Sequence, residues 1–192
     1  DQAVIAIENV RLFTELEARN RDLTDTLEQQ TATSEILSVI SSSPTDVQPV
    51  FDTIASNARR LCNADSGSVF TYDGSMVHLV SLDNTSPERS DALRGVYPLV
   101  PTLETVGGRA LLTRQPVHIS DVRDDPTYVL PSLQDAGLRS VLSVPMLRDG
   151  LPVGIIIVHT WVTPRPFTRT QIDLLKTFAD QAVIAIQSVR LF

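Results

Sequence analysis

The first forty residues show one continuous helical pattern. They contain no proline and no glycine, which predicts a single long helix that ends between Ser41 and Pro44. Its large apolar residues approximate a spacing of three and four, as in the seam of a coiled coil: Ile5, Leu12, Leu16, Leu23, Leu27, Leu37 and Ile40. Asn9, Arg19 and Gln30 fall where the seam calls for apolar residues, so the register is weakly fixed and the pattern allows a shift between two registers. A second stripe on the opposite side means that an isolated helix cannot bury all of its apolar surface: Ala3, Ile7 and Val10.

The rest of the chain mixes helical and strand patterns. A capping box at residues 45–48 and apolar residues at helical spacing up to Cys62 predict an amphipathic helix. The dipeptides Asp73-Gly74 and Asp149-Gly150 predict hairpin turns between the strands that flank them. The predicted strands are 68–72, 76–82, 117–120, 140–147 and 153–161, with a short helix at 109–113 after Gly107-Gly108. A second capping box, at 168–171, begins a last helix with heptad spacing: Ile172, Leu175, Ala179, Ala182, Ile186 and Val189.

This order of elements predicts an α+β fold with a largely antiparallel sheet. Residues 154–158 are apolar at every position, so that strand should be covered on both faces. One face can take the helix at 46–62 and the last helix. The segment at 84–137, made of loops and short helices, must close the other face, and a small-molecule cavity is expected beneath it.

The two ends of the chain are nearly identical. DQAVIAIENVRLF at residues 1–13 recurs as DQAVIAIQSVRLF at 180–192, with two differences. A fixed offset marks a repeated unit, so we expect a parent protein with at least two tandem copies. Residues 1–44 would then be a helical connector that begins with the tail of a preceding copy, and 45–192 one domain. The alternative is a single domain with two similar terminal helices.

Composition narrows the functional classes. Sixteen basic against 23 acidic residues argue against nucleic acid or an anionic membrane as the main partner. The longest apolar stretch, near 153–162, is interrupted by His159 and Thr160 and is shorter than the roughly 20 residues that span a bilayer. The only cysteine, Cys62, cannot form an internal disulfide, which suits a reducing cytoplasm.

No residue pattern indicates catalysis or a metal. His78, His118 and His159 lie on different predicted strands without nearby ligands, so ordinary sheet histidines are favoured over a metal site. Asp121, Asp124 and Asp125 lack the terminal glutamate of an EF-hand and are expected to cap turns. No nucleophile turn G-x-S-x-G occurs, and we expect neither a cofactor nor enzymatic activity.

Several stretches in order resemble the GAF family of regulatory domains over residues 45–192. They are residues 58–70 (ARRLCNADSGSVF), 106–110 (VGGRA), 115–122 (QPVHISDV), 125–128 (DPTY) and 140–155 (SVLSVPMLRDGLPVGI). The resemblance implies a six-stranded antiparallel sheet, although the residue pattern gives five strands. It also implies ligand sensing or dimerisation without catalysis. A tandem arrangement with a helical connector resembles bacterial signalling proteins, most often sensor histidine kinases.

The resemblance suggests where a ligand could bind. Backbone N–H groups at Gly107 and Gly108 could seat an anion, as in cyclic-nucleotide-binding relatives, although a tight turn with positive φ is the favoured interpretation. With His118 and Ser143 they are the candidate ligand contacts. The N-K and F-x-x-x-D-E patterns of cyclic-nucleotide binders are absent, since Gln171 and Ile172 occupy the D-E positions. Cys62 is expected to be a buried hydrophobe, which disfavours bilin attachment, and one thiol disfavours sulfoxide reduction.

We therefore expect a cytoplasmic sensory module of a two-component system. It would dimerise through its N- and C-terminal helices, bind a small ligand, and signal to an output domain elsewhere in the parent. The alternatives are a ligandless dimerisation spacer and a cyclic-nucleotide-binding module that regulates a cyclase or phosphodiesterase.

Overall fold

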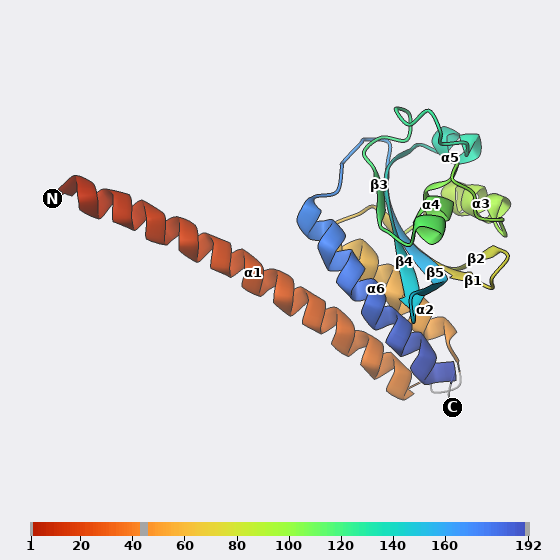
Figure 1. Ribbon diagram of the computed structural model, residues 1–192, viewed down its shortest axis with the longest axis horizontal. Helices are drawn as coiled ribbons and strands as arrows, with labels where there is room; N and C mark the ends of the chain where they lie inside the picture. The colour runs from red at the N-terminus through yellow and green to blue at the C-terminus, as the bar shows by residue number, and fades with distance from the viewer. Residues whose placement is uncertain (1, 43–45, 191–192) are drawn as a thin grey trace.

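An antiparallel sheet separates a layer of long helices from a layer of loops and short helices (Figure 1). The computed structural model describes residues 2–42 and 46–190. The elements in chain order are α1 (Gln2–Ser42), α2 (Gln48–Leu61), β1 (Ser66–Tyr72), β2 (Val77–Asp83), α3 (Pro87–Val96), α4 (Val106–Thr113), β3 (Val117–Ile119), α5 (Pro131–Asp135), β4 (Leu138–Arg148), β5 (Leu151–Trp161) and α6 (Arg169–Arg190). The predicted α+β class and the five strands are confirmed.

The sheet has the order β2-β1-β5-β4-β3, and all neighbouring strands are antiparallel. Both Asp-Gly turns form hairpins with positive φ at Gly74, Asp149 and Gly150, as predicted. The resemblance implied a sixth strand, and this prediction is wrong: the sheet formed by the described residues has five strands. Its place is taken by one bridge, in which the backbone N–H and C=O groups of Val77 and Leu99 exchange hydrogen bonds of 2.8 and 3.0 Å.

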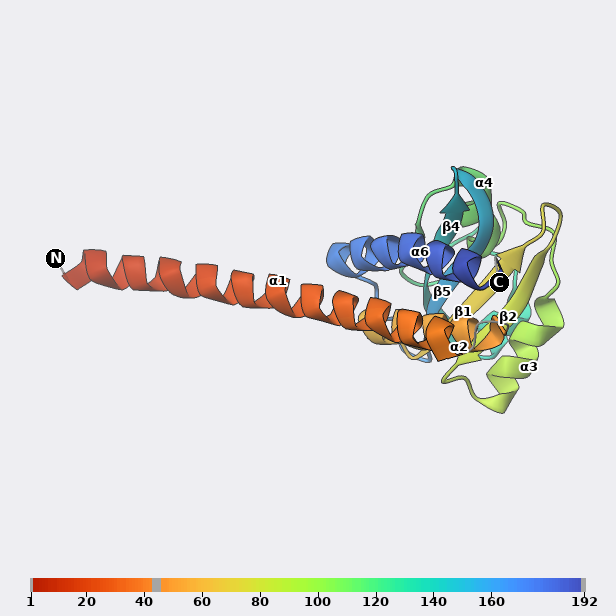
Figure 2. The same ribbon diagram turned by 90° about the horizontal axis from the view of Figure 1, so that it is seen from below.

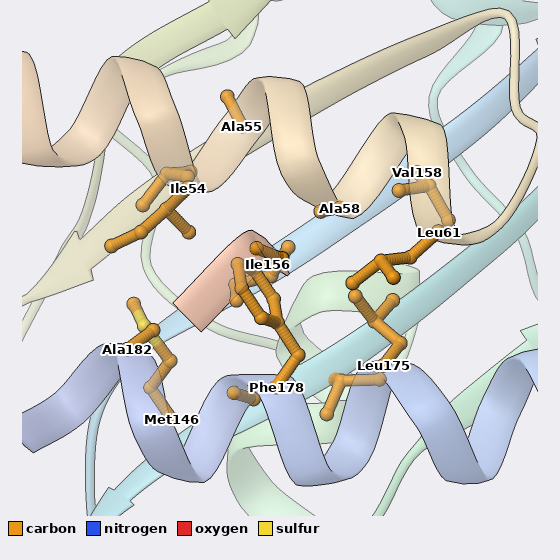
Figure 3. Packing of buried hydrophobic residues seen from close by; sticks show 14 of the residues in the cluster. Ile54, Ala55, Ala58, Leu61, Met146, Ile156, Val158, Leu175, Phe178 and Ala182 are labelled. Carbon is orange, nitrogen blue, oxygen red and sulfur yellow. The ribbon is translucent and has the colours of Figure 1, made fainter. Parts of the chain in front are cut away.

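Strand β5 is covered on both faces, which confirms the prediction from its unbroken apolar run. Ile156 and Val158 belong to the core beneath α2 and α6, whereas Ile155 and Ile157 belong to the core beneath α3, α4 and α5. Figure 3 shows the first of these cores, where Phe178 of α6 lies against Ile156. We call the face under α2 and α6 the helix face, and the other the cap face.

Helix α6 buries the middle of its heptad-spaced stripe in its own domain, while Ile172 is partly buried and the Val189 side chain lies outside what the structure describes. Leu175, Ala179 and Ala182 are fully buried and Ile186 is 9% exposed. The stripe predicted as a coiled-coil seam is therefore a core stripe that packs on the helix face of the sheet (Figure 3). A period of 3.5 to 3.6 residues shows that a helix has an apolar face, but it does not show which surface covers that face.

Helix α1 is one unbroken helix, as predicted, and projects far beyond the sheet (Figures 1 and 2). Its C-terminal part packs against α2 and α6 through the buried residues Ala32 and Ile36. It ends at Ser42, within the predicted limits. The capping box predicted from Thr45 lies outside the described residues; α2 begins after Val47, and Asp46 Oδ1 accepts a hydrogen bond of 2.9 Å from the Gln48 backbone N–H. Among the described helices, none is both long and apolar enough to cross a bilayer.

Candidate functional site

The cap face is where a ligand cavity was expected, and its side chains fill it. The Phe70 and Tyr97 rings pack there at a tilt of 45°, with ring centroids 4.5 Å apart. The gap that remains between α4 and the sheet does not admit a water molecule. It is lined by Val77, Tyr97, Leu99, Pro101, Thr105, Gly107, Gly108 and Ile155. In this conformation the space between α4 and the sheet is closed, so a ligand could enter that space only if the cap moved.

Gly107 and Gly108 lie in the first turn of α4, not in a tight turn before it. Neither has a positive φ, so the favoured interpretation of the pair was wrong. Thr105 caps the helix, and its Oγ1 accepts a hydrogen bond of 3.1 Å from the Gly108 N–H. A Cβ on Gly107 would lie 2.6 Å from Ile155 Cδ1, and one on Gly108 would lie 2.0 Å from the Thr102 backbone oxygen. The pair is therefore required for close packing of α4 against the sheet and the preceding loop.

The four candidate ligand contacts do not form one constellation. The neighbours of Ser143 on β4, Leu142 and Val144, belong to the helix-face core, so the Ser143 side chain lies on the cap face. Gly107 and Gly108 belong to α4, which covers that face. His118 lies on the short strand β3, and its Nε2 accepts a hydrogen bond of 3.1 Å from the Phe167 backbone N–H. Phe167 belongs to the helix-face core, and desolvation lowers the pKa of His118. A ligand role for any of the four stays a prediction.

Two buried polar atoms under the cap have no hydrogen-bond partner among the described residues: Ser143 Oγ and Tyr128 OH. Ser143 is fully buried and Tyr128 is 7% exposed. Burial strongly raises the pKa of the Tyr128 phenol, and the nearby Tyr97 adds to this effect. An unpartnered buried hydroxyl costs about 1–3 kcal/mol, so these atoms are where a polar ligand or a water would gain most.

The cap is held in place by Arg109 of α4. Its guanidinium forms an ion pair of 2.5 Å with Asp125, and its Nε donates to the Leu103 backbone oxygen at 2.6 Å. This arginine is the main reason that the pKa of Asp125 lies well below its usual range. Asp121 is paired with Arg139 and accepts a hydrogen bond from the Arg123 backbone N–H. These two aspartates stabilise loops, and among the described residues no cluster of three or more His, Cys, Asp or Glu side chains could hold a metal.

The sequence did not predict a cluster of polar and aromatic side chains in the core of the sheet. Trp161 Nε1 donates a hydrogen bond of 2.8 Å to Ser66 Oγ, which lies 3.4 Å from His159 Nδ1. The rings of His159 and Trp161 stack at 5.6 Å, and the Arg89 guanidinium lies 4.9 Å from the Trp161 ring centroid. Desolvation lowers the pKa of His159 to about 4. The interruption of the apolar run at His159 was the one visible signal.

A groove of about 310 Å³ opens on the helix face, between α6 and the sheet. It is lined by Thr71, Met146, Arg148, Val153, Val183, Ile186 and Gln187. Val183, Ile186 and Gln187 are the counterparts of Val4, Ile7 and Glu8 in the repeated segment. In α6 this segment packs on the domain, whereas in α1 Val4 and Ile7 are 69% and 71% exposed.

Polar contacts between described residues help to attach α1 to the domain. Asn57 Nδ2 of α2 donates a hydrogen bond of 3.1 Å to the Ala32 backbone oxygen. Arg60 pairs with Glu35 at 2.6 Å, and Thr33 donates to the Gln181 side chain of α6. Helix α1 therefore contacts both helices of the helix face over its C-terminal part, from about Ala32 to Val39, while its first twenty residues are exposed.

Comparison with known proteins agrees with this fold. A family model for the GAF domain matches residues 46–186. Among solved structures, the GAF domain/HD domain protein from Geobacter sulfurreducens superposes with a TM-score of 0.66 at 19% identity, over 79% of this chain and 98% of that one. The second GAF domain of DevS from Mycobacterium smegmatis gives 0.57 at 24% identity, over 74% and 94%.

A third similar structure is an enzyme, the free methionine-R-sulfoxide reductase from Neisseria meningitidis. It superposes with a TM-score of 0.66 at 17% identity, over 85% of this chain and 90% of that one. At these identities the structures establish the fold alone. No curated protein matches the chain significantly.

Proposed function

This chain belongs to the GAF domain family, and on that basis we propose that it is a non-catalytic sensory module that dimerises through α1 and passes its state along its terminal helices. GAF domains are sensory or regulatory modules of diverse signalling proteins. The proposed setting is a cytoplasmic two-component system, with the output domain elsewhere in a longer parent. Support for that setting comes from the sequence resemblance to tandem-domain sensor kinases.

The observation that carries the proposal is an uncovered apolar stripe on α1. Its five members are each 50–61% exposed: Ile5, Leu12, Leu16, Leu23 and Leu27. Contiguous exposed apolar surface of this kind marks an interaction site. A second copy of the same helix is the natural partner, because most soluble oligomers are symmetric and use one patch twice. The buried stripe of α6 is not available for this role, so α1 carries the proposed contact.

The sheet offers a physical connection between the cap and these helices. Strand β5 contributes alternate side chains to both cores, so a displacement on the cap face repositions residues that contact α6. Helix α6 in turn contacts α1 through Gln181 and Thr33. A ligand that binds better when the cap is open would then shift the equilibrium between two arrangements of the helices. The free-energy shift is at most the difference between its binding free energies for the two arrangements.

A small ligand under the cap is supported by Ser143 Oγ and Tyr128 OH, which are buried and have no hydrogen-bond partner among the residues that the structure describes. The filled gap beside α4 supports the second candidate function, a ligandless spacer that sets dimer geometry. A thermal-shift screen of cyclic nucleotides, amino acids and aromatic acids separates the two. A binder whose shift is lost in Tyr128→Phe but kept in Tyr72→Phe supports ligand sensing. If nothing binds, the spacer is supported, and a cyclic nucleotide as the only binder would support regulation of a cyclase or phosphodiesterase.

Dimerisation is tested by light scattering at tens of micromolar. The chain should be a dimer, and Leu16→Glu should convert it to a monomer. Ala18→Glu is the matched control, because it places the same charge on the opposite side of the same exposed helix. A monomeric wild-type chain, or equal effects of the two variants, would contradict the proposal.

The state of Cys62 supports the absence of thiol chemistry. The side chain is 1% exposed, and burial raises its pKa to about 12. A catalytic thiol must reach its substrate as a thiolate, which this environment disfavours. We expect no reduction of free methionine sulfoxide by the wild-type chain. Turnover that disappears in Cys62→Ser would overturn this part of the proposal.

A further inference from the structure

The first turns of α1 carry the same apolar face that α6 buries against the sheet. In α6 four residues of this face are buried: Ala182, Val183, Ala185 and Ile186. Their counterparts in the repeated segment are all exposed, and we call them the N-terminal patch: Ala3, Val4, Ala6 and Ile7. Neither of the two sequence differences between the segments falls in this patch, so it can make the same contacts with the same kind of surface.

The outward side of the repeated segment is preserved as well. Ile184 of α6 is 65% exposed although its helix packs on the sheet, and its counterpart Ile5 is 60% exposed. The repeat therefore keeps both a side that a sheet covers and a side that the sheet leaves open. Of these two sides, only the first has different environments in α1 and α6.

The N-terminal patch and the attached end of α1 lie on the same side of the helix. Ala3 and Ala32 are 29 residues apart, and so are Ile7 and Ile36. Eight turns of an α-helix take about 29 residues and rise about 44 Å. Because α1 is one unbroken helix, a domain that covers Ile7 lies on the same side as the domain that buries Ile36.

This side of α1 is apolar only at its two ends. Between Val10 and Ala32 the positions that face the same way are polar, apart from one alanine: Thr14, Ala18, Arg21, Asp25 and Glu28. The exposed stripe from Ile5 to Leu27 lies on the opposite side and is apolar along its whole length. The polar stretch suits water between two covered ends, so the pattern is that of one helix with a domain at each end.

We propose that the N-terminal patch is covered by the helix face of a second GAF domain of this kind, whose last helix is the beginning of α1. The two domains then share one continuous helix and lie on the same side of it, about 44 Å apart. The stripe from Ile5 to Leu27 is left free on the opposite side. This arrangement goes beyond the function proposed above and does not require dimerisation.

The full chain itself tests whether the repeated segments are equivalent. Gln187→Glu combined with Ser188→Asn gives the end of α6 the sequence of residues 1–13. Gln187 lines the same groove as Arg148, so the new carboxylate lies near a positive charge, and the urea midpoint should shift by less than about 0.3 M. Val183→Glu is the control, because it places a charge on the buried face and should lower the midpoint by at least about 1 M. A loss of that size in the double variant would overturn the proposal.

A duplicated chain tests the arrangement of the domains. Residues 1–179 are followed by the full sequence 1–192, so the start of the second unit completes the last helix of the first. Single cysteines are placed in that shared helix, as Ile7→Cys or Ile5→Cys, and their labelling by a thiol reagent is timed. The chain without them gives the background, because Cys62 is buried.

Each variant is compared with the same variant of the single chain, so any protection by pairing of the stripe cancels. Labelling should slow at least about tenfold at position 7 and change less than about threefold at position 5, because only position 7 becomes buried. Val4→Cys should behave like Ile7→Cys, and it keeps the test valid if the shortened isoleucine disturbs the first domain.

Three results would overturn the shared helix. Protection at position 5 instead of position 7 would place the second domain on the opposite side. Unchanged labelling at positions 4 and 7 would show that no domain covers the patch. Labelling at position 7 that is already slow in the single chain would show that a second copy of the chain covers it. Light scattering of the single chain tests the dimer separately, so the two proposals can fail independently.

Discussion

The start of α1 and the end of α6 have nearly the same sequence and opposite environments. Val183 and Ile186 are 6% and 9% exposed, whereas their counterparts Val4 and Ile7 are 69% and 71% exposed. Both segments are helical, so the local sequence determines the helix and its apolar face. The difference shows that burial depends on the surface the chain supplies nearby, and α6 has a sheet beneath it while the first turns of α1 have none.

Shortening the same side chain in the two copies should have very different effects on stability. Ile186→Ala should lower the free energy of unfolding by about 2–5 kcal/mol, because it loses buried apolar area and leaves a cavity. Ile7→Ala should change it by less than about 0.5 kcal/mol, as expected for an exposed site. Urea unfolding at one protein concentration measures both. Equal losses would mean that the start of α1 is covered by protein in solution.

The adjacent glycines of α4 also have identical side chains and different surroundings. In Gly108→Ala the new Cβ meets the Thr102 backbone, which cannot move away cheaply, so a loss of about 3 kcal/mol is expected. In Gly107→Ala it meets the end of the flexible Ile155 side chain, and the loss should be smaller. Thermal unfolding compares the two variants. A larger loss at Gly107 would show that α4 does not pack as described.

His159 is buried and His118 is half-buried, so the two should contribute differently to the pH dependence of stability. The pKa of His159 is lowered from 6.5 to about 4, so below pH 6.5 the unfolded chain binds a proton that the folded chain does not. Stability is therefore full above pH 6.5 and is lost as the pH falls towards 4, by about 2 kcal/mol between pH 6.5 and 5. Urea unfolding across this range should show the loss.

The loss should be largely absent in His159→Gln. His118→Gln is the matched control, since only half-burial lowers the pKa of His118, and it should remove a smaller part. A wild-type profile that is flat from pH 7 to 5 would contradict the burial of His159.

The smallest expected effect is a gain. Tyr128→Phe removes a buried hydroxyl that has no partner under the cap, so it should stabilise the ligand-free chain by about 1 kcal/mol. Tyr72→Phe is the control, because the Tyr72 hydroxyl donates to the Gly74 backbone oxygen in an exposed turn. A loss of stability in Tyr128→Phe would show that this hydroxyl is satisfied in solution.

The sequence predicted the elements well because their signals are local. The two Asp-Gly turns fix hairpins, and an apolar run such as 154–158 requires cover on both faces of the sheet. A stretch of forty residues without proline or glycine likewise predicts a long helix. None of these inferences depends on knowing which segments meet in space.

The candidate site was predicted less well because it depends on distant neighbours. The apolar run at 154–158 indicated that the last helix could cover one face of the sheet, but the periodicity of α6 fitted a coiled-coil seam equally well and did not decide between the two. His118 and Ser143 lie near each other in the sheet, but they contact different cores. The adjacent glycines Gly107 and Gly108 suggested a turn. In the structure they are required because a side chain at Gly107 would clash with Ile155 on β5, and one at Gly108 would clash with the backbone of Thr102 in the preceding loop.

Helix α1 is a single rigid helix that is anchored to the domain near its C-terminal end, so it can act as a lever. About 45 Å of helix lies before the contacts at Ala32, at 1.5 Å per residue. A tilt of about 5° at those contacts displaces the far end by about 4 Å, close to the rise of one helical turn. Because the contact from Ala32 to Val39 is about 10 Å long, a shift of about 1 Å across it is magnified about fourfold at the far end of α1.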